Sequence, residues 1–313
     1  HIHAPGGIMR IEDNLSAFLL AKEAAGRSPA TLGFYRDNIR AFIKFLESSG
    51  INGSSWLRPE TFEVFLVRER RNGLAPATVH ARFRALRAFF NWLVDRGRVD
   101  HNPLLKVEPP AVPKTAPRAV ALAAVDQLAD SIPSGDDATW TDVRDRLLLV
   151  LMFWTGLRLS EVAGLAVRDV DVKERLLHVR KGKGGRDRFV PFPQGTGALV
   201  LSYLMARPPW VGPELLLSND GAGGVRGVIQ AAGIRTMIRR RCKSAGVEYS
   251  NPHAFRHGFA MALLNAGGLE MGVLSKLLGH SELKTTQSIY ADWVTESLRR
   301  EYDTAQSAVR KRS

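Results

Sequence analysis

Four prolines fall within nine residues about a third of the way along the chain, at positions 109, 110, 113 and 117. A segment of this composition is extended and semi-rigid, and it has no hydrophobic periodicity of its own. The length of 313 residues also fits two domains better than one. We therefore predict domains over residues 9–105 and 119–313, joined by a linker over residues 106–118. Residues 1–8 precede Met9, and we expect them to be an added segment outside the fold.

The smaller domain is predicted to consist of helices, because its apolar residues recur at helical spacing. Ile11, Leu15 and Phe18 mark the first helix. Ser28 followed by Pro29 has the pattern of a helix cap and a first helical position. The other expected helices run from Pro29 to Gly50, from Pro59 to about Arg71, and from Pro76 to just before Gly97.

The larger domain is predicted to be helical at both ends with a β region between them. Helices are expected over residues 121–131 and 142–155, and Ser160 is interpreted as the cap of a helix that starts at Glu161. Residues 176–180 and 186–192 are predicted to form a hairpin around the glycine-rich turn 182–185. From Gly227 onward the pattern is again helical. The expected fold class is mainly α with a small antiparallel β-sheet.

Several common classes of protein and site are excluded by the composition. No apolar run approaches the ~20 residues of a membrane span. The single cysteine, Cys242, leaves no disulfide framework and no cysteine-based zinc site, and a reducing cytoplasm is the expected compartment. His253 and His257 are four residues apart, but no carboxylate lies at an offset suited to a metal site. We therefore expect no metal and no cofactor.

The charge of the chain favours a nucleic-acid partner. The formal net charge is +13 with a pI near 10.3, and both predicted domains are basic. Such an excess suits contact with phosphates in both halves, although a merely soluble basic protein would also show it. His80, Arg84 and Arg87 share the helix face opposite the apolar stripe. That face is a candidate phosphate contact, and a solvated polar face explains it equally well.

A set of six residues carries the strongest chemical signal. Arg158 follows a buried helix and has apolar neighbours, so it needs a bound anion or a carboxylate partner. His253 and Arg256 are three apart and share a helical face. The full set, which contains no carboxylate, is Arg158, Lys183, His253, Arg256, His280 and Tyr290.

This inventory suits attack of a tyrosine on a phosphodiester without a metal ion. Two guanidiniums can neutralise the charge of a pentacoordinate transition state. A phenol with a pKa near 10 benefits from a nearby histidine that helps remove its proton. A lysine on a turn can protonate the leaving 5′-oxygen.

The chain resembles the tyrosine recombinases, also called phage integrases, over nearly its whole length. The motifs are residues 155–161 (TGLRLSE), the turn 182–184 followed by RFVP at 188–191, residues 252–260 (PHAFRHGFA), and the closing segments 278–281 and 285–290. The resemblance implies a SAM-like core-binding domain at the N-terminus and a mixed α/β catalytic domain. A simple Xer-like or transposon-type member without an arm-binding domain is favoured.

The resemblance also implies roles. Tyr290 would be the nucleophile that forms a 3′-phosphotyrosyl bond, although it lies ten residues after His280 and Tyr302 is a second tyrosine nearby. Lys183 would be the general acid, with Lys181 as the alternative. Arg158, Arg256 and His280 would hold the phosphate, His253 would act as acid or base, and Glu161 would support the site. The basic residues around the turn, Arg180, Lys181 and Arg186, would contact DNA.

The implied activity is site-specific cutting and rejoining of double-stranded DNA, in integration, excision or dimer resolution. The implied assembly is a tetramer on two sites in the cytoplasm, associated with the nucleoid, with an accessory protein as a possible further partner. The segment after Tyr290, with Val294 and Leu298, would pack on a neighbouring subunit or in cis. A catalytically silent DNA-binding protein of the same fold and a type IB topoisomerase-like enzyme are the alternatives.

Overall fold

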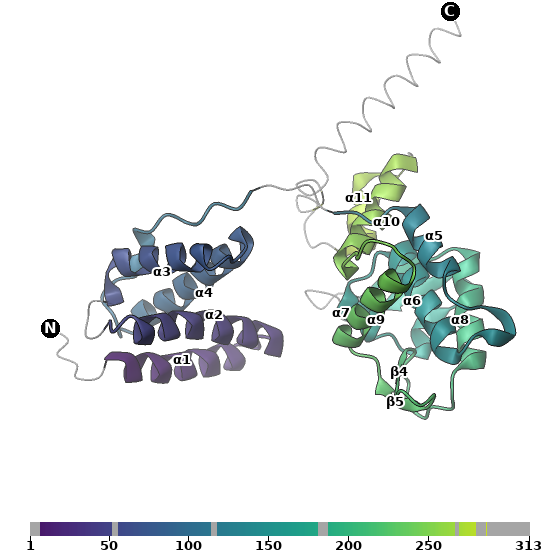
Figure 1. Cartoon of the computed structure of the whole chain (residues 1–313), viewed down its shortest axis with the longest axis horizontal. Coiled ribbons are helices and arrows are strands. Elements are labelled where there is room, and N and C mark those ends of the chain that lie inside the picture. The colour runs from purple at the N-terminus through teal and green to yellow at the C-terminus, as the bar shows by residue number, and fades with distance from the viewer. Residues whose placement is uncertain are drawn as a thin grey trace, which may run out of the picture. The chain divides into compact units, whose positions relative to one another are not determined.

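The structure is a computed structural model that describes residues 7–51, 56–113, 118–180, 187–266, 269–279 and 286. The chain divides into two compact units, His1–Thr115 and Ala116–Ser313. Figure 1 labels the helices of both units and some of the strands of the second. None of the helices in the described ranges is long and apolar enough to cross a membrane.

The first unit is built from helices, as the apolar spacing predicted. They are α1 (Gly7–Ala24), α2 (Pro29–Ser48), α3 (Pro59–Arg71) and α4 (Pro76–Asp95), followed by the short 3-10 turn Pro103–Leu105. The Ser28 hydroxyl accepts a hydrogen bond from the Thr31 amide, which confirms the expected cap of α2. α2 packs against α1 and α4. The core is rich in aromatic rings, with Phe42 stacked on Phe62 at 4.7 Å between ring centroids.

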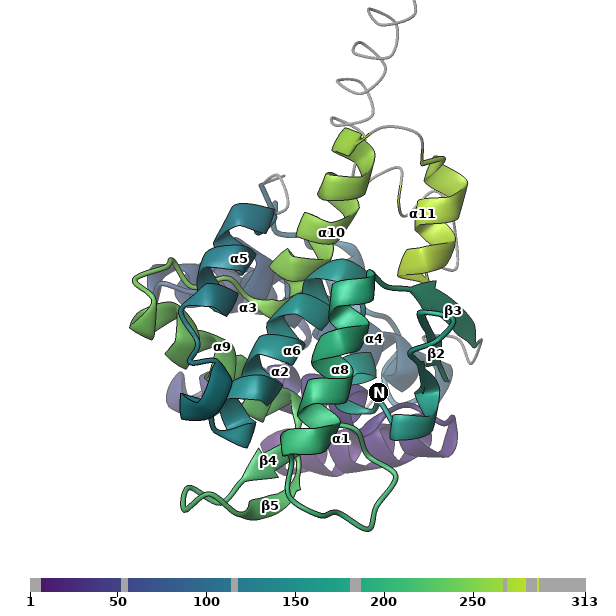
Figure 2. The same ribbon diagram turned by 90° about the vertical axis from the view of Figure 1, so that its right-hand side faces the viewer.

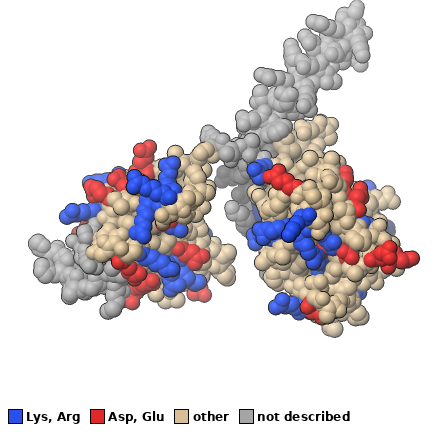
Figure 3. Space-filling model, in the orientation of Figure 1, with Lys and Arg blue, Asp and Glu red and all other residues tan. Residues whose placement is uncertain are grey.

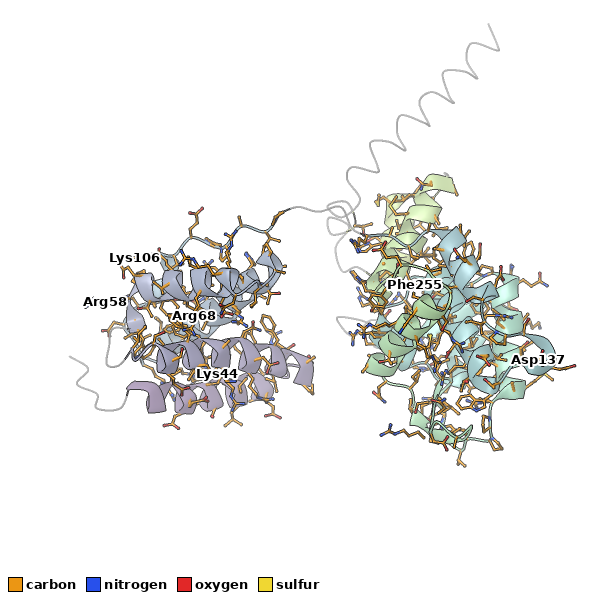
Figure 4. All side chains as sticks on the ribbon, in the orientation of Figure 1. Lys44, Arg58, Arg68, Lys106, Asp137 and Phe255 are labelled. Carbon is orange, nitrogen blue, oxygen red and sulfur yellow. The ribbon has the colours of Figure 1, made fainter. Side chains whose placement is uncertain are left out.

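The second unit is organised around α6 (Trp140–Thr155). Its consecutive residues Leu147, Leu148 and Leu149 are all fully buried, so most of the circumference of this helix is covered by neighbouring elements. It packs against α5 (Leu122–Asp130), α8 (Gln194–Ala206) and α10 (Pro252–Ala266), as Figure 2 shows. Phe255 of α10, labelled in Figure 4, belongs to the same core. The remaining helices are α7 (Leu159–Ala163), α9 (Ala231–Ser244) and α11 (Met271–Leu278).

Two small antiparallel sheets complete this unit. β1 (Val170–Asp171), β2 (Leu176–Val179) and β3 (Arg188–Pro191) pair in that order, with Val179 opposite Arg188. The predicted hairpin is therefore present, with its turn 181–186 outside the described residues. β4 (Leu217–Asn219) and β5 (Val225–Val228) form the second sheet. The expected fold class, mainly α with small antiparallel sheets, is confirmed.

Two local predictions are wrong. Ser160 does not cap a helix, because α7 begins at Leu159 and Arg158 is the residue before it. The Glu161 carboxylate accepts the Arg158 amide at 2.8 Å, and that bond fixes the earlier start. The pattern from Gly227 onward is not helical at its start, because Gly227 belongs to β5 and the next helix begins at Ala231. The backbone of Gly227 pairs with Ser218 of β4, and this strand pairing replaces the helix that was expected here.

Gly156 ends α6 in a left-handed conformation, and it lies against α10 and α11. Its φ is 57°, and a Cβ at this position would lie 2.4 Å from Cδ1 of Phe259. We expect Gly156→Ala to lower the free energy of unfolding by about 2–4 kcal/mol, the sum of backbone strain and overpacking. Thermal or denaturant unfolding would measure the loss.

Gly246→Ala is the matched control, because Gly246 also has a positive φ (66°), whereas a Cβ added there would meet no atom within 4 Å. This variant should lose only the backbone component, about 1–2 kcal/mol. Equal losses in the two variants would contradict a steric role for the contact with Phe259.

Candidate active site

Arg158 lies between the end of α6 and the start of α7, where the left-handed Gly156 turns the chain. Its guanidinium is partly buried, with 23% of the side chain exposed. Nη1 donates to Oε1 of Glu161 at 3.0 Å, and Nη2 donates to the carbonyl of Gly279 at 2.9 Å. Of the two partners predicted for Arg158, an anion or a carboxylate, the structure supplies the carboxylate one turn away. Arg158 also binds a backbone oxygen 121 positions later.

Arg256 occupies the first half of α10 and is almost completely buried, at 3% exposure. Nη1 donates to the carbonyl of Gly156 at 2.7 Å, and Nη2 donates to the carbonyl of Leu278 at 2.6 Å. A buried guanidinium requires acceptors for its N–H groups, and these two carbonyls lie at the ends of α6 and α11. Arg256 therefore joins the ends of two helices next to Arg158.

A third arginine, Arg188, lies at the start of β3 and completes the arrangement. It donates from Nη1 and Nη2 to the two oxygens of Glu161, at 3.0 and 2.7 Å, and from Nε to the carbonyl of Leu277 at 2.9 Å. Arg188 belongs to one of the family-like motifs of the sequence, but the sequence alone assigned it no role. The sequence shows an arginine in the RFVP segment, but it does not show that this arginine pairs with Glu161, which lies 27 positions away.

The last turn of α11 accepts from all three arginines. The carbonyls of Leu277, Leu278 and Gly279 receive Arg188, Arg256 and Arg158 respectively. These are among the carbonyls that a helix leaves without intrahelical partners, and positive charge is favoured at that end. α11 ends above β3 in Figure 2, in agreement with its contacts to that strand. The arginines are thus held side by side by three successive backbone acceptors.

Glu161 is ionised within this cluster. Burial by itself raises the pKa of a carboxyl group, but the hydrogen bonds from Arg188 and from the Arg158 amide outweigh it, so the pKa of Glu161 lies below its usual range. The cluster thus contains three guanidiniums and one carboxylate, which pairs with Arg158 and Arg188. The cluster keeps an excess of positive charge, which suits a bound anion such as a phosphodiester.

His253 stands at the start of α10, where the side chain of Asn251 accepts from its amide at 2.9 Å. Part of its side chain is exposed, as a group that meets a substrate must be, and part is buried against the site. Partial burial lowers the pKa of His253, and the charges of Arg256 and Arg158 lower it further. At neutral pH the imidazole is therefore uncharged and can accept a proton.

His257 lies one turn along α10 and packs its ring edge-on against His253, with centroids 4.7 Å apart. Burial lowers the pKa of His257 to about 4, with help from the charges of His253 and Arg256. In the unfolded chain a histidine has a pKa near 6.5. Since the unfolded state binds the extra proton between these values, stability must fall as the pH drops from about 6.5 towards 4.

The full difference in pKa would correspond to about 3.4 kcal/mol. We expect a loss of about 2 kcal/mol for His257, because the ring is only partly buried and solvent screens its interactions. It would be measured as the free energy of unfolding at a series of pH values. His257→Asn should make the slope between about pH 6.5 and 4 shallower, whatever its effect on stability at mildly alkaline pH. An unchanged slope in His257→Asn would contradict the assignment of the lowered pKa to this residue.

Five of the predicted site residues lie outside the described residues: Lys181, Lys183, Arg186, His280 and Tyr290. The alternative nucleophile Tyr302 lies outside them too. Arg180 is described, and its Nε donates to the buried carboxylate of Asp169 at 2.5 Å while 45% of the side chain stays exposed. The structure therefore brings together Arg158, Glu161, His253 and Arg256 of the predicted set.

The predicted contact face of the first unit lines a hollow of about 390 Å³. Arg84 and Arg87 are exposed along it, opposite Phe34 and Tyr35 of α2. The ring of His80 is engaged elsewhere, since its Nδ1 lies 2.8 Å from the carbonyl of Pro110. His80 thus ties the proline segment to α4.

A second basic surface escaped the sequence analysis. Arg235, Arg239 and Lys243 are exposed on α9 at intervals of four residues, and α9 packs against α7. Figure 3 shows Lys and Arg gathered over this part of the unit. The spacing was visible in the sequence, but only the fold places this helix beside the helix that begins after Arg158.

Within the described ranges, no three His, Cys, Asp or Glu side chains come together as a metal site would require.

Comparison with known proteins identifies the class to which this fold and site belong. Residues 123–296 match the phage integrase family, and residues 18–97 match the N-terminal SAM-like domain of phage integrases. The chain belongs to the phage integrase family, the tyrosine recombinases.

Full-length relatives are found among the Xer recombinases. Tyrosine recombinase XerC of Chromohalobacter salexigens is 35% identical over 292 residues, which cover 91% of this chain and 93% of the relative. Tyrosine recombinase XerA of Thermococcus kodakarensis is 34% identical over 280 residues, 90% of each chain. The structure of the Tn1549 transposon integrase in complex with transposon right end DNA has a TM-score of 0.71 at 18% identity, over 95% of this chain and 99% of that one.

Proposed function

We propose that this tyrosine recombinase, an enzyme that breaks and rejoins DNA strands at specific sites, binds the scissile phosphate between Arg158 and Arg256. The observation that carries the proposal is the adjacent placement of these guanidiniums on successive carbonyls of α11, with uncharged His253 beside them. A guanidinium is planar and presents several N–H donors in a fork that matches the oxygens of a phosphate, so this residue type suits the non-bridging oxygens. His280 follows directly after Gly279 and is assigned the same phosphate.

In the proposed reaction, the phenol oxygen of Tyr290 attacks the phosphorus as the bond to the 5′-oxygen breaks. The phenol proton passes to His253, and Lys183 donates a proton to the leaving 5′-oxygen. The product is a 3′-phosphotyrosyl bond and a free 5′-hydroxyl. Attack of a 5′-hydroxyl from the partner strand reverses these steps and releases the tyrosine. Arg158 and Arg256 stabilise the charge on the pentacoordinate phosphorus in both directions.

The proposed partner is double-stranded DNA, held by basic surfaces of both units. In the first unit these are Arg84 and Arg87, with His80 beside them. In the second they are the α9 residues Arg235, Arg239 and Lys243, together with Arg180, Lys181 and Arg186. Relatives of this fold have been crystallised on DNA, among them a lambda integrase dimer bound to a core site. We assign this chain a tetramer on paired sites, in which one subunit acts on each strand.

Covalent trapping tests this function. A suicide substrate carries the cognate site with a nick close to the scissile phosphate, so that a short fragment leaves after cleavage and religation fails. We expect a denaturant-resistant protein–DNA complex in the presence of EDTA, and a junction product when two intact sites are supplied.

Other outcomes would contradict the proposal. Tight specific binding without any adduct would indicate a DNA-binding protein of the same fold that has lost catalysis. An adduct on DNA of any sequence, with relaxation of supercoils and no junction, would indicate a topoisomerase-like enzyme.

A further inference from the structure

The Glu161 carboxylate is shared between two arginines, and the two do not use it equally. Arg188 donates to both oxygens, from Nη1 at 3.0 Å and from Nη2 at 2.7 Å. Arg158 gives it one side-chain bond at 3.0 Å and one amide bond at 2.8 Å. A carboxylate has about four acceptor sites, so these four bonds saturate it.

Arg188 is itself fixed in place. Its side chain is 11% exposed, and its Nε donates to the carbonyl of Leu277. The guanidinium also lies against the backbone of Gly279, where a Cβ would be only 2.8 Å from Nη1. Gly279 has a φ of 63°, so glycine serves both the left-handed turn and the close approach of Arg188. Strand β3, helix α7 and the end of α11 therefore meet at this one side chain.

Removal of Arg188 would leave a buried carboxylate with a full negative charge and half of its donors. Arg158 is the nearest remaining cation, and two-point pairing is the preferred geometry between an arginine and a carboxylate. Glu161 would then draw the Arg158 guanidinium into a second bond, away from the carbonyl of Gly279. The pair would be neutral, and the phosphate would lose one of its two arginines.

We propose that Arg188 is a positioning residue that saturates Glu161 and thereby keeps Arg158 available to the scissile phosphate. This role rests on the proposed function, in which Arg158 binds that phosphate. It also explains why a phosphate-binding cluster contains a buried carboxylate. Glu161 fixes the start of α7 through the Arg158 amide, and Arg188 prevents that carboxylate from neutralising the arginine beside it.

A double-mutant design separates this role from a merely structural one. Arg188→Met should slow adduct formation at saturating DNA by about 10²-fold, since one charged donor to the transition state is withdrawn. Glu161→Gln keeps an oxygen for the Arg158 amide and removes the competing charge. The double variant Glu161→Gln with Arg188→Met should therefore be at least about tenfold faster than Arg188→Met alone, the sign of coupling that direct competition produces.

Arg146→Met is the matched control. Arg146 binds the carbonyls of Ala129 and Ile132 at the end of α5, much as Arg188 binds the end of α11, but it touches no carboxylate there. We expect its adduct rate to match the wild type. The unfolding temperature of every variant would be measured at the same time, so that a loss of folded protein is recognised.

Two results would overturn the positioning role: an Arg188→Met adduct rate close to that of the wild type, or a double variant no faster than the single one. Binding of inorganic phosphate, followed by calorimetry, provides a readout without DNA chemistry. Its affinity should fall about tenfold in Arg188→Met and recover in the double variant. An absence of adduct in the wild type would count against the proposed function, and the phosphate series would then decide the role of Arg188 by itself.

Discussion

Replacement of Tyr290 by phenylalanine should reduce the covalent protein–DNA complex to background while DNA binding stays within about twofold of the wild type. The change removes one oxygen, and with it the only protein atom that the proposed reaction joins to phosphorus. Phenylalanine keeps the ring, so packing around the position is preserved. The measurement is denaturing electrophoresis of the suicide-substrate reaction, together with a binding titration on the same intact site.

Tyr302→Phe decides between the two tyrosines. Under our proposal its adduct carries the same tryptic peptide as the wild-type adduct, the one that contains Tyr290. An adduct that survives in Tyr290→Phe and is lost in Tyr302→Phe would move the nucleophile to the second position. The ten-residue separation between His280 and Tyr290 would then no longer describe the closing motif.

The second large effect is expected at Arg256. Arg256→Lys keeps the charge, but a single ammonium group cannot reproduce the two divergent bonds to Gly156 and Leu278. We expect adduct formation to slow by about 10²- to 10³-fold, the usual effect of removing a donor to a developing oxyanion. Stability should also fall by about 1–3 kcal/mol, because a buried carbonyl loses its partner. Single-turnover kinetics and thermal unfolding would measure the two effects separately.

Arg207→Lys provides the comparison, since Arg207 also donates to two carbonyls, those of Glu214 and Leu215, and has no assigned contact with DNA. Arg207→Lys should lower the free energy of unfolding and leave the rate of adduct formation at saturating DNA unchanged. If Arg256→Lys lost stability to a similar extent but kept its rate, Arg256 would be a structural residue and the phosphate clamp would be wrong.

The sequence was most informative where neighbouring residues act together. His253 and Arg256 lie on one helical turn, and Arg158 and Glu161 flank one helix start, so their spacing alone places them in reach of each other. The helices of the first unit followed from apolar periodicity for the same reason. Both the spacing of these residues and the apolar periodicity are local features of the sequence, and the helix geometry that they predict is the same in the folded protein.

The features that the sequence did not predict depend mostly on contacts between residues far apart in the chain. The pairing of Arg188 with Glu161 requires β3 to lie beside the start of α7, and its bond to Leu277 joins positions 89 residues apart. No local pattern encodes that distance. The short strands β4 and β5 were missed because three or four residues carry too little periodicity, and the ladder is irregular between Ser218 and Asn219. The early start of α7 was missed because its cap is a carboxylate inside the helix.

The arginines recognise the end of α11 through main-chain oxygens, and this has a consequence for how the sequence can vary. Every residue type offers the same carbonyl, so the side chains at positions 277 and 278 are constrained only by the core into which they pack. Gly279 is different, because its missing Cβ makes room for Arg188. Substitutions at 277 and 278 that preserve volume should therefore be neutral for DNA cleavage, whereas a change in the length of α11 would shift every acceptor at once. In this stretch of chain, the number of residues matters more than their identity.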